Sequence, residues 1–216
     1  LFLSERHLIT FGGMVGLLEA MLPNVIKCLS DKNSNLMLET LSFVRLLLET
    51  HEPAAMHPFI EELLPAVLQC ATEDWYKIIA EALRVVGVVT SVMRPIDASA
   101  DMFAASAFDH TPHVTSLYNA VLPRLAATDI DQEIKSCAIA AMGRVLAHLA
   151  DGLEGDQLDQ VLPLFMDRMR NEITRMPTLK ALALIARSPL DVDLSSILPA
   201  AMETLGSFLR QQLRAL

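Results

Sequence analysis

The sequence predicts an all-α protein in which pairs of helices stack into a solenoid, a superhelix without a closed core. Three observations predict this class: an apolar composition poor in aromatic residues, a recurrence of apolar segments about every forty residues, and helical spacing of the apolar residues within them. Hydrophobic residues make up 52% of the 216 residues, but aromatic residues only 5%. This composition suits helices packed on helices and lacks the aromatic and β-branched strands of a β-sandwich.

The recurrence is marked by an apolar residue followed by proline. The steps between these prolines are 42, 58, 40 and 36 residues, and three of the four lie close to the period of about 40 to 47 residues of HEAT-type repeats. We therefore expect about four to five HEAT-type helix pairs. The pairs that mark the period are Leu22-Pro23, Leu64-Pro65, Leu122-Pro123, Leu162-Pro163 and Leu198-Pro199.

The first helix of each pair carries the proline, which removes an amide donor and should bend the helix. We expect first helices at residues 16–30, 54–71, 112–127, 156–170 and 195–213. Eight residues after four of the prolines stands a polar or acidic residue, which would close the first helix and cap the second. These residues are Asp31, Glu73, Asp131 and Asn171.

The second helices are expected at residues 34–50, 75–93, 132–150 and 172–187. In the third of them, apolar residues occupy every position that a helical stripe requires, from Ile134 to Leu149. Together the elements predict one HEAT-repeat solenoid over residues 1–216, with approximate repeats at 16–50, 54–93, 112–150 and 156–187 and an incomplete one at 195–216.

The 58-residue step predicts a long loop at residues 94–110, because proline, aspartate and serine interrupt the helical pattern there. Phe103 and Phe108 should fold this loop back onto the stack. The last expected helix is apolar along one side and no second helix follows it. We therefore expect the chain to be an internal piece of a longer protein, and the isolated piece to self-associate through exposed end faces.

Several classes of function are disfavoured. A net charge of -9 works against binding nucleic acid. The sequence contains no uninterrupted run of eighteen apolar residues, so it does not predict a membrane-spanning helix. The cysteines Cys28, Cys70 and Cys137 stand far apart and do not predict a disulfide framework or a zinc site. No phosphate-binding loop or metal-binding histidine pattern occurs. We therefore expect no catalytic residues, cofactor or metal, and a protein that is not an enzyme.

Candidate partner-binding residues are the charged side chains on the otherwise apolar second helices, which should line the concave side of the stack. Three bases recur twelve residues after a proline, and they either pair with turn acids such as Asp74 and Asp131 or form an exposed row for an acidic partner. The candidates are Lys77, Glu81, Arg84, Lys135, Arg144, Arg175 and Lys180.

Several stretches of sequence resemble the HEAT repeats of the cullin-associated, neddylation-dissociated family. They include Met56-His57-Pro58-Phe59, Ala80-Glu81-Ala82-Leu83-Arg84-Val85, Asn171-Glu172-Ile173-Thr174-Arg175 and Ser188-Pro189-Leu190. The resemblance covers about residues 22–216 and implies the middle of a long solenoid. It implies a cytoplasmic or nuclear scaffold that binds a cullin with its RING subunit, when the cullin lacks its ubiquitin-like modifier, and that promotes exchange of substrate adaptors on ubiquitin ligases.

Two other functions remain open at this point. A nuclear transport receptor of the karyopherin type is likewise an acidic HEAT solenoid, and binding to Phe-Gly repeats or to a small GTPase would distinguish it. A hydrolase built on an α-solenoid would need a nucleophile, a base and an orienting group within hydrogen-bond reach of one another.

Overall fold

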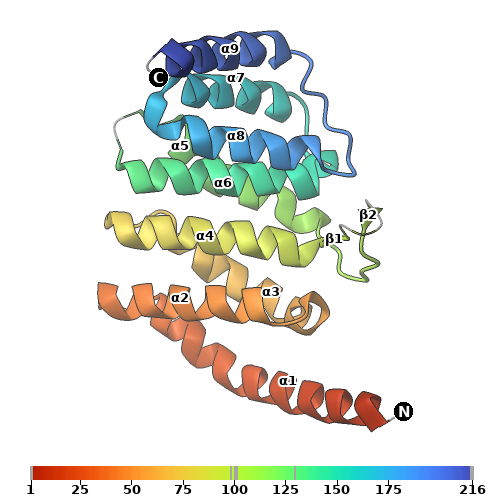
Figure 1. Ribbon diagram of the computed structural model, residues 1–216. Coiled ribbons are helices and arrows are strands. Elements are labelled where there is room, and N and C mark those ends of the chain that lie inside the picture. Colours follow the sequence, from red (N-terminus) through yellow and green to blue (C-terminus); the bar gives the residue numbers. More distant parts are fainter. Residues whose placement is uncertain (1, 98, 100–101, 129, 215–216) are drawn as a thin grey trace.

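The structure is a computed structural model, and it describes residues 2–97, 99, 102–128 and 130–214. Within these residues nine α-helices follow one another as pairs stacked in file (Figure 1), which confirms the predicted all-α solenoid. The helices are α1 (Phe2–Leu29), α2 (Ser34–Thr50), α3 (Pro53–Cys70), α4 (Tyr76–Met93), α5 (Val114–Ala126), α6 (Gln132–Leu149), α7 (Gln157–Arg170), α8 (Glu172–Ala186) and α9 (Leu198–Arg214).

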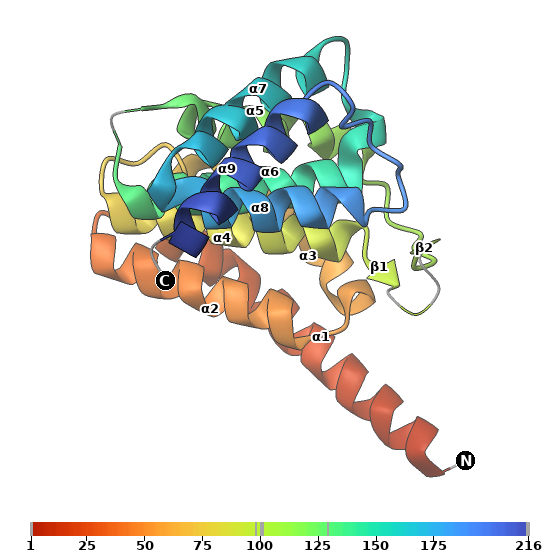
Figure 2. The same ribbon diagram turned by 45° about the horizontal axis from the view of Figure 1, so that its top comes forward.

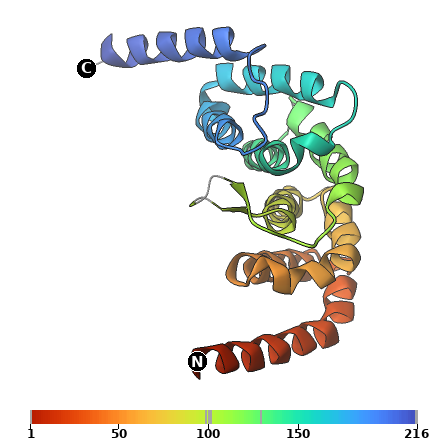
Figure 3. The same cartoon turned by 90° about the vertical axis from the view of Figure 1, so that its right-hand side faces the viewer.

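The helices form two layers. The even-numbered helices α2, α4, α6 and α8 lie side by side, each in contact with the next, and α3, α5 and α7 cover their other side. Viewed along its edge, the stack is curved, with the even-numbered layer on the concave side (Figure 3). The first part of α1 and the whole of α9 extend toward this side and bound the hollow at its two ends.

The spacing of the second helices follows the predicted period. They begin at residues 34, 76, 132 and 172, which gives steps of 42, 56 and 40 residues. The long step contains the expected loop, but the loop also holds a short hairpin that the sequence did not predict: β1 (Ile96–Asp97) pairs antiparallel with β2 (Met102–Phe103). Residues 98, 100 and 101 of the loop, and 215 and 216 of the fifth predicted repeat, lie outside the described residues.

Both phenylalanines fold the loop back, as predicted. The ring of Phe108 lies between the rings of His57 and His113, with centroid distances of 4.8 and 5.7 Å. The guanidinium of Arg94 lies 3.8 Å from the centroid of the Phe103 ring. Phe108 thus attaches the loop near the start of α3, and Phe103 attaches the hairpin to Arg94 at the end of α4. The hairpin projects at one edge of the concave side (Figure 3).

Helix α1 is longer than predicted, since it begins at Phe2 and not near residue 16. Its first part extends beyond the rest of the stack (Figure 2). Gly12 and Gly13 lower helix propensity by roughly 1 kcal/mol each, but the helix continues through both. The recurring prolines lie within α1, α3, α5 and α7, as predicted, whereas Pro199 is the second residue of α9, which begins three residues later than expected.

The predicted capping residues act as caps in two repeats. The Asp131 carboxylate accepts a hydrogen bond of 2.7 Å from the amide of Glu133 at the start of α6, and the Asn171 side chain accepts one of 3.0 Å from Ile173 at the start of α8. In the first repeat the cap of α2 is Asn33, two residues after the predicted position, and α4 begins after Trp75 without a side-chain cap.

Two arginines, the buried Arg168 and the half-buried Arg124, connect successive first helices. The guanidinium of Arg168 on α7 donates hydrogen bonds of 2.7 to 3.1 Å to the carbonyls of residues 125–127, where α5 ends. Arg124 on α5 binds the carbonyl of Ala71, at the end of α3, in the same way at 3.0 and 3.2 Å. Each arginine satisfies carbonyls that a helix end leaves without a partner, so the odd-numbered layer is joined by hydrogen bonds as well as by apolar packing.

Candidate protein-binding surface

The concave even-numbered layer divides into two halves, which differ in the ion pairs that their charged side chains form. The first half runs from α2 across α4 to the start of α6, and the second half lies between α6 and α8. Both halves carry candidate residues from the sequence. The structure shows which of these side chains already have partners within the chain.

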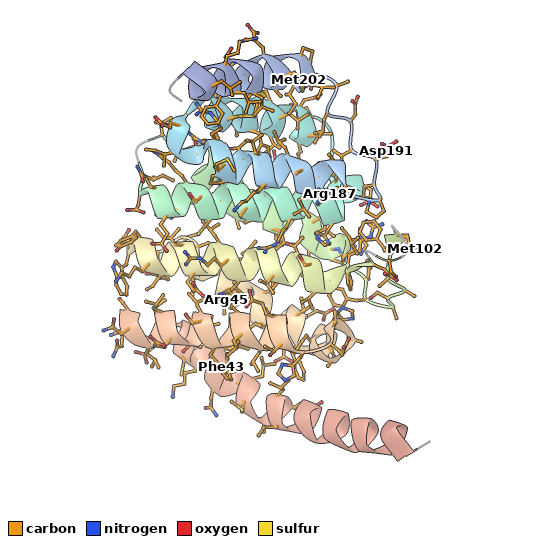
Figure 4. All side chains as sticks on the ribbon, in the orientation of Figure 1. Phe43, Arg45, Met102, Arg187, Asp191 and Met202 are labelled. Carbon is orange, nitrogen blue, oxygen red and sulfur yellow. The ribbon has the colours of Figure 1, made fainter. Side chains whose placement is uncertain are left out.

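A chain of ion pairs, called here the ion-pair ladder, crosses α2, α4 and α6 in the first half. The Glu81 carboxylate receives the guanidinium of Arg45 at 2.6 Å and that of Arg84 at 2.9 Å. Arg45 also pairs with Glu49 at 3.0 Å, and Arg84 reaches Glu133 on α6. Figure 4 shows Arg45 on the concave side between α2 and α4. The ladder therefore links three neighbouring helices through their charged side chains.

Glu81 is the centre of the ladder and is buried, with 5% of the residue exposed. Burial alone would raise the pKa of its carboxyl group, but the hydrogen bonds from Arg45 and Arg84 outweigh burial and hold the pKa below its usual value. The carboxylate thus remains charged, and its two partners compensate for the loss of water.

A second polar contact joins the far ends of α4 and α6. Arg94 pairs with Asp151 at 2.7 Å and donates to the carbonyl of His148 at 3.1 Å. The Nδ1 atom of the buried His148 lies 2.7 Å from the carbonyl oxygen of Arg94 and donates to it. Burial lowers the pKa of His148, and the positive charges of Arg144 and Arg94 lower it further. The hydrogen bond to the Arg94 carbonyl raises the pKa, but the net change is downward. The folded protein therefore favours the neutral form of His148 in this contact.

In the second half, α6 and α8 approach closely through small residues. A Cβ atom added to Gly143 would lie 2.7 Å from the Cβ atom of Ala181, so only glycine fits there. Between the two helices lies an open depression of about 370 Å³, called here the α6–α8 groove. It is lined by Ser136, Ala140, Arg144, Pro177, Lys180, Ala181 and Leu184.

The cations of this half have no acidic partner within the described part of the chain. Arg144 and Lys180 line the groove, and the exposed Arg187 follows Lys180 by seven positions, directly after the end of α8 (Figure 4). Ile173 and Met176, on the same helix, are 53% and 54% exposed. The second half thus offers solvent both positive charge and apolar surface.

The seven candidate residues fall into three groups. Glu81 and Arg84 belong to the ion-pair ladder, and Arg144 and Lys180 line the groove. The other three, Lys77, Lys135 and Arg175, lie near the turns that join the paired helices.

Lys77, Lys135 and Arg175 were expected either to pair with turn acids or to form an exposed row. Within the described part of the chain, none of the three forms an ion pair. Arg175 instead donates to the carbonyls of Met169 and Arg170 at the end of α7, both at 3.1 Å, and stacks on the ring of Phe208. The ammonium of Lys77 lies 5.6 Å from the ring centroid of Trp75, and Lys135 is half-buried on α6.

Sequence reasoning missed two important cations. Arg45 was not a candidate, although it is the main partner of Glu81, because the two residues are 36 positions apart and nothing in a single sequence pairs them. Arg187 was also missed, but it lies on the face of Lys180 at a spacing of seven residues, so the helical period could have identified it.

The reactive side chains have structural surroundings. Cys70 and Cys137 are buried, and burial raises the pKa of each thiol to about 11, so both are protonated near neutral pH. The described residues contain no group of three or more His, Cys, Asp or Glu side chains arranged to hold a metal ion. Of the described helices, none combines the length and apolar character needed to cross a lipid bilayer.

Comparison with known proteins identifies relatives along the whole chain. Cullin-associated NEDD8-dissociated protein 1 of Drosophila melanogaster is 40% identical over 219 residues, covering 100% of this chain and 17% of that protein. The protein of the same name from Arabidopsis thaliana is 42% identical over 91% of this chain and 16% of its own length. Cullin-associated NEDD8-dissociated protein 2 of Mus musculus is 40% identical over 95% of this chain and 16% of its own length. The chain thus spans about a sixth of each relative.

Solved structures support the fold alone. Two crystal structures of engineered proteins match with TM-scores of 0.59 and 0.58 at 13% and 14% identity. They cover 86% and 85% of this chain, and the matches extend over 68% and 69% of those chains.

A family model described as CAND1-like, TPR repeats, matches residues 12–142. TPR repeats recur about every 34 residues, whereas the second helices here recur at 42 and 40 residues outside the long loop, a spacing closer to that of HEAT repeats. The match extends over more than half of the chain, and the chain therefore belongs to the CAND1-like family of helical repeat proteins.

Proposed function

We propose that this chain is a cullin-binding segment of a scaffold protein and that its concave even-numbered layer faces the cullin. The names of its relatives, which describe cullin-associated proteins, support this assignment. Solenoids use extended concave surfaces to wrap large proteins, and the curvature seen here provides such a surface.

The observation that carries the proposal is the exposure of apolar and cationic side chains together on the concave side. Ile173 and Met176 of α8 supply apolar area of the kind found at the centre of protein interfaces, and Lys180 supplies charge beside them. Binding needs shape and charge complementarity only, so the proposed function is non-catalytic.

The finer proposal follows the resemblance in the sequence. The parent protein binds a cullin with its RING subunit, in the cytoplasm or nucleus, while the cullin lacks its ubiquitin-like modifier, and this binding promotes exchange of substrate adaptors on the ubiquitin ligase. The net charge of -9 supports a protein partner over nucleic acid or an anionic membrane surface.

Site-specific photo-crosslinking tests which layer faces the cullin. A photoreactive phenylalanine derivative placed at Met176, on α8 of the concave layer, should crosslink to a purified unmodified cullin–RING complex. The same derivative at Asn119, exposed on α5 of the other layer, is the matched control and should crosslink weakly. Crosslinking from Asn119 alone would reverse the proposed orientation, and an absence of any association in a pull-down would remove the function.

The modifier provides the second arm of the same experiment. The proposal predicts that attaching the ubiquitin-like modifier to the cullin reduces both the pull-down and the Met176 crosslink when the full-length protein is used. Equal binding to both forms of the cullin would contradict the finer proposal and leave cullin binding in place.

A further inference from the structure

We propose that the α6–α8 groove binds an acidic amphipathic helix of the protein partner, with carboxylates placed two helical turns apart. This inference rests on the proposed function, because it specifies which element of the partner the concave layer receives. The groove is defined by its lining residues given above, and Arg187 extends its positive rim.

The ladder arginines and the cations around the α6–α8 groove differ in whether they have acidic partners. The chain has 26 acidic and 17 basic side chains, so acids are available to neutralise cations. On the concave layer Arg45, Arg84 and Arg94 all pair with acids. In the described part of the chain, Arg144 and Lys180 do not, and neither does Arg187. The positive charge left on this half is complementary to an acidic partner.

The shape and chemistry of the groove suit an amphipathic helix. Its floor consists of small and apolar residues, including Ala140, Ala181 and Leu184, which allow a helix to approach closely. Ile173 and Met176 extend the apolar surface along α8. An occupant must therefore present apolar side chains to the floor as well as carboxylates to the rim, which describes an amphipathic helix better than an unstructured acidic tail.

The spacing of the cations matches the repeat of an α-helix. Arg187, which caps the end of α8, lies seven positions after Lys180, roughly 10 Å along the helix axis at about 1.5 Å per residue. Carboxylates seven positions apart on a docked helix have the same separation. Arg144 lines the groove from α6. Its guanidinium lies over Gly87 of α4, where an added Cβ atom would be 2.7 Å from the guanidinium nitrogen, so Arg144 adds positive charge at the α4 side of the groove.

A designed peptide tests the inference directly on the 216-residue chain. The probe is a fluorescein-labelled amphipathic helix of about 18 residues, with leucine and alanine on one face and two pairs of glutamates seven positions apart. Fluorescence anisotropy should show saturable binding that weakens as salt is added. A peptide with glutamine in place of each glutamate should bind at least about tenfold more weakly.

Charge removal identifies the groove as the site. The triple variant Arg144→Gln, Lys180→Gln, Arg187→Gln should bind the acidic peptide about tenfold more weakly. A control triple variant, Lys27→Gln, Lys32→Gln, Arg170→Gln, changes the net charge equally at exposed positions elsewhere and should bind like the wild type. Equal losses in both triple variants would show attraction by net charge alone and would overturn the inference.

Filling the groove gives a test that leaves charge unchanged. Ala140→Phe places a ring on the groove floor and should abolish peptide binding, whereas Ala186→Phe, exposed on α8 outside the lining, should have no effect. Circular dichroism of each variant confirms that the helices are retained. Unchanged peptide binding by folded Ala140→Phe would contradict docking in the groove.

The same variants separate this inference from the proposed function. If the wild type captures the cullin–RING complex and the groove variants capture it equally well, the groove inference fails and cullin binding stands. If the wild type binds the acidic peptide in the groove but not the cullin, the groove stands and its partner is another protein with an acidic helix.

Discussion

The two halves of the concave layer hold neighbouring helices together in different ways. Between α2, α4 and α6, a buried glutamate draws two arginines inward, and their charges are used within the chain. Between α6 and α8, Gly143 and Ala181 bring the helices into close contact, and Arg144 and Lys180, which line the groove there, form no ion pair within the described part of the chain. A charged side chain on an apolar helix can therefore serve either the fold or a partner, and its neighbours across the seam decide which.

The largest effect is expected in the ladder. Glu81→Ala removes the carboxylate that two guanidinium groups share and should lower the free energy of unfolding by about 3 kcal/mol. Glu49→Ala is the control, since it removes an exposed partner of the same Arg45 and should cost less than about 1 kcal/mol. Urea denaturation followed by circular dichroism measures both, and equal small losses would show that burial of Glu81 is unimportant.

A smaller effect is expected at the α6–α8 seam. Gly143→Val introduces side-chain atoms against Ala181 and should cost about 2 kcal/mol, because the helices must separate. The double variant with Ala181→Gly should recover part of that loss, since it removes the facing methyl group. Additive losses in the same denaturation experiment would mean that the two residues do not determine the helix separation.

Acidification should weaken the joint between α4 and α6 next. The folded pKa of His148 is lowered, so its contribution to stability is present above about pH 6.5, the usual value, and is lost as the pH falls through the folded pKa. Thermal unfolding between pH 7.5 and 5 should therefore show a lower Tm at acidic pH. His148→Asn keeps a hydrogen-bond donor for Arg94 and should flatten this dependence, whereas an unchanged slope would assign it to other groups.

The weakest effect is expected at α9, which exposes its apolar face, whereas Gly143 and Ala181 are covered where α6 meets α8. Leu198, Met202, Leu209 and Leu213 are 56 to 74% exposed. We expect weak self-association of the isolated chain through this face, with a dissociation constant on the order of 0.1 mM. Sedimentation equilibrium should show it for the wild type and not for Met202→Glu with Leu209→Glu. A monomer at every concentration would contradict this expectation.

The sequence predicted the solenoid because its signals are local and repeated. The recurring prolines and the helical stripe of α6 both report on single helices, and stacking follows from their period. The hairpin of β1 and β2 was not predicted, since strands of two residues are too short to show an alternating pattern.

The division of the concave layer was beyond the sequence for a different reason. Glu81 and Lys180 look alike as isolated charges on apolar helices. Their surroundings differ because Arg45 pairs with Glu81 across a helix seam, whereas Lys180 forms no ion pair with an acid among the described residues. Contacts between helices 36 or more residues apart depend on register and helix separation, which a single sequence does not encode visibly.

The most direct test compares a groove variant and a ladder variant in one binding assay. The groove variant is the triple variant Arg144→Gln, Lys180→Gln, Arg187→Gln, and the ladder variant is Arg45→Gln. For each of the two, the affinity for an unmodified cullin–RING complex and the free energy of unfolding should be measured. We predict that the groove variant loses about tenfold in affinity at unchanged stability, and that Arg45→Gln loses stability at unchanged affinity. The same loss of affinity in both variants, or in neither, would contradict the assignment of free cations to the partner and paired cations to the fold.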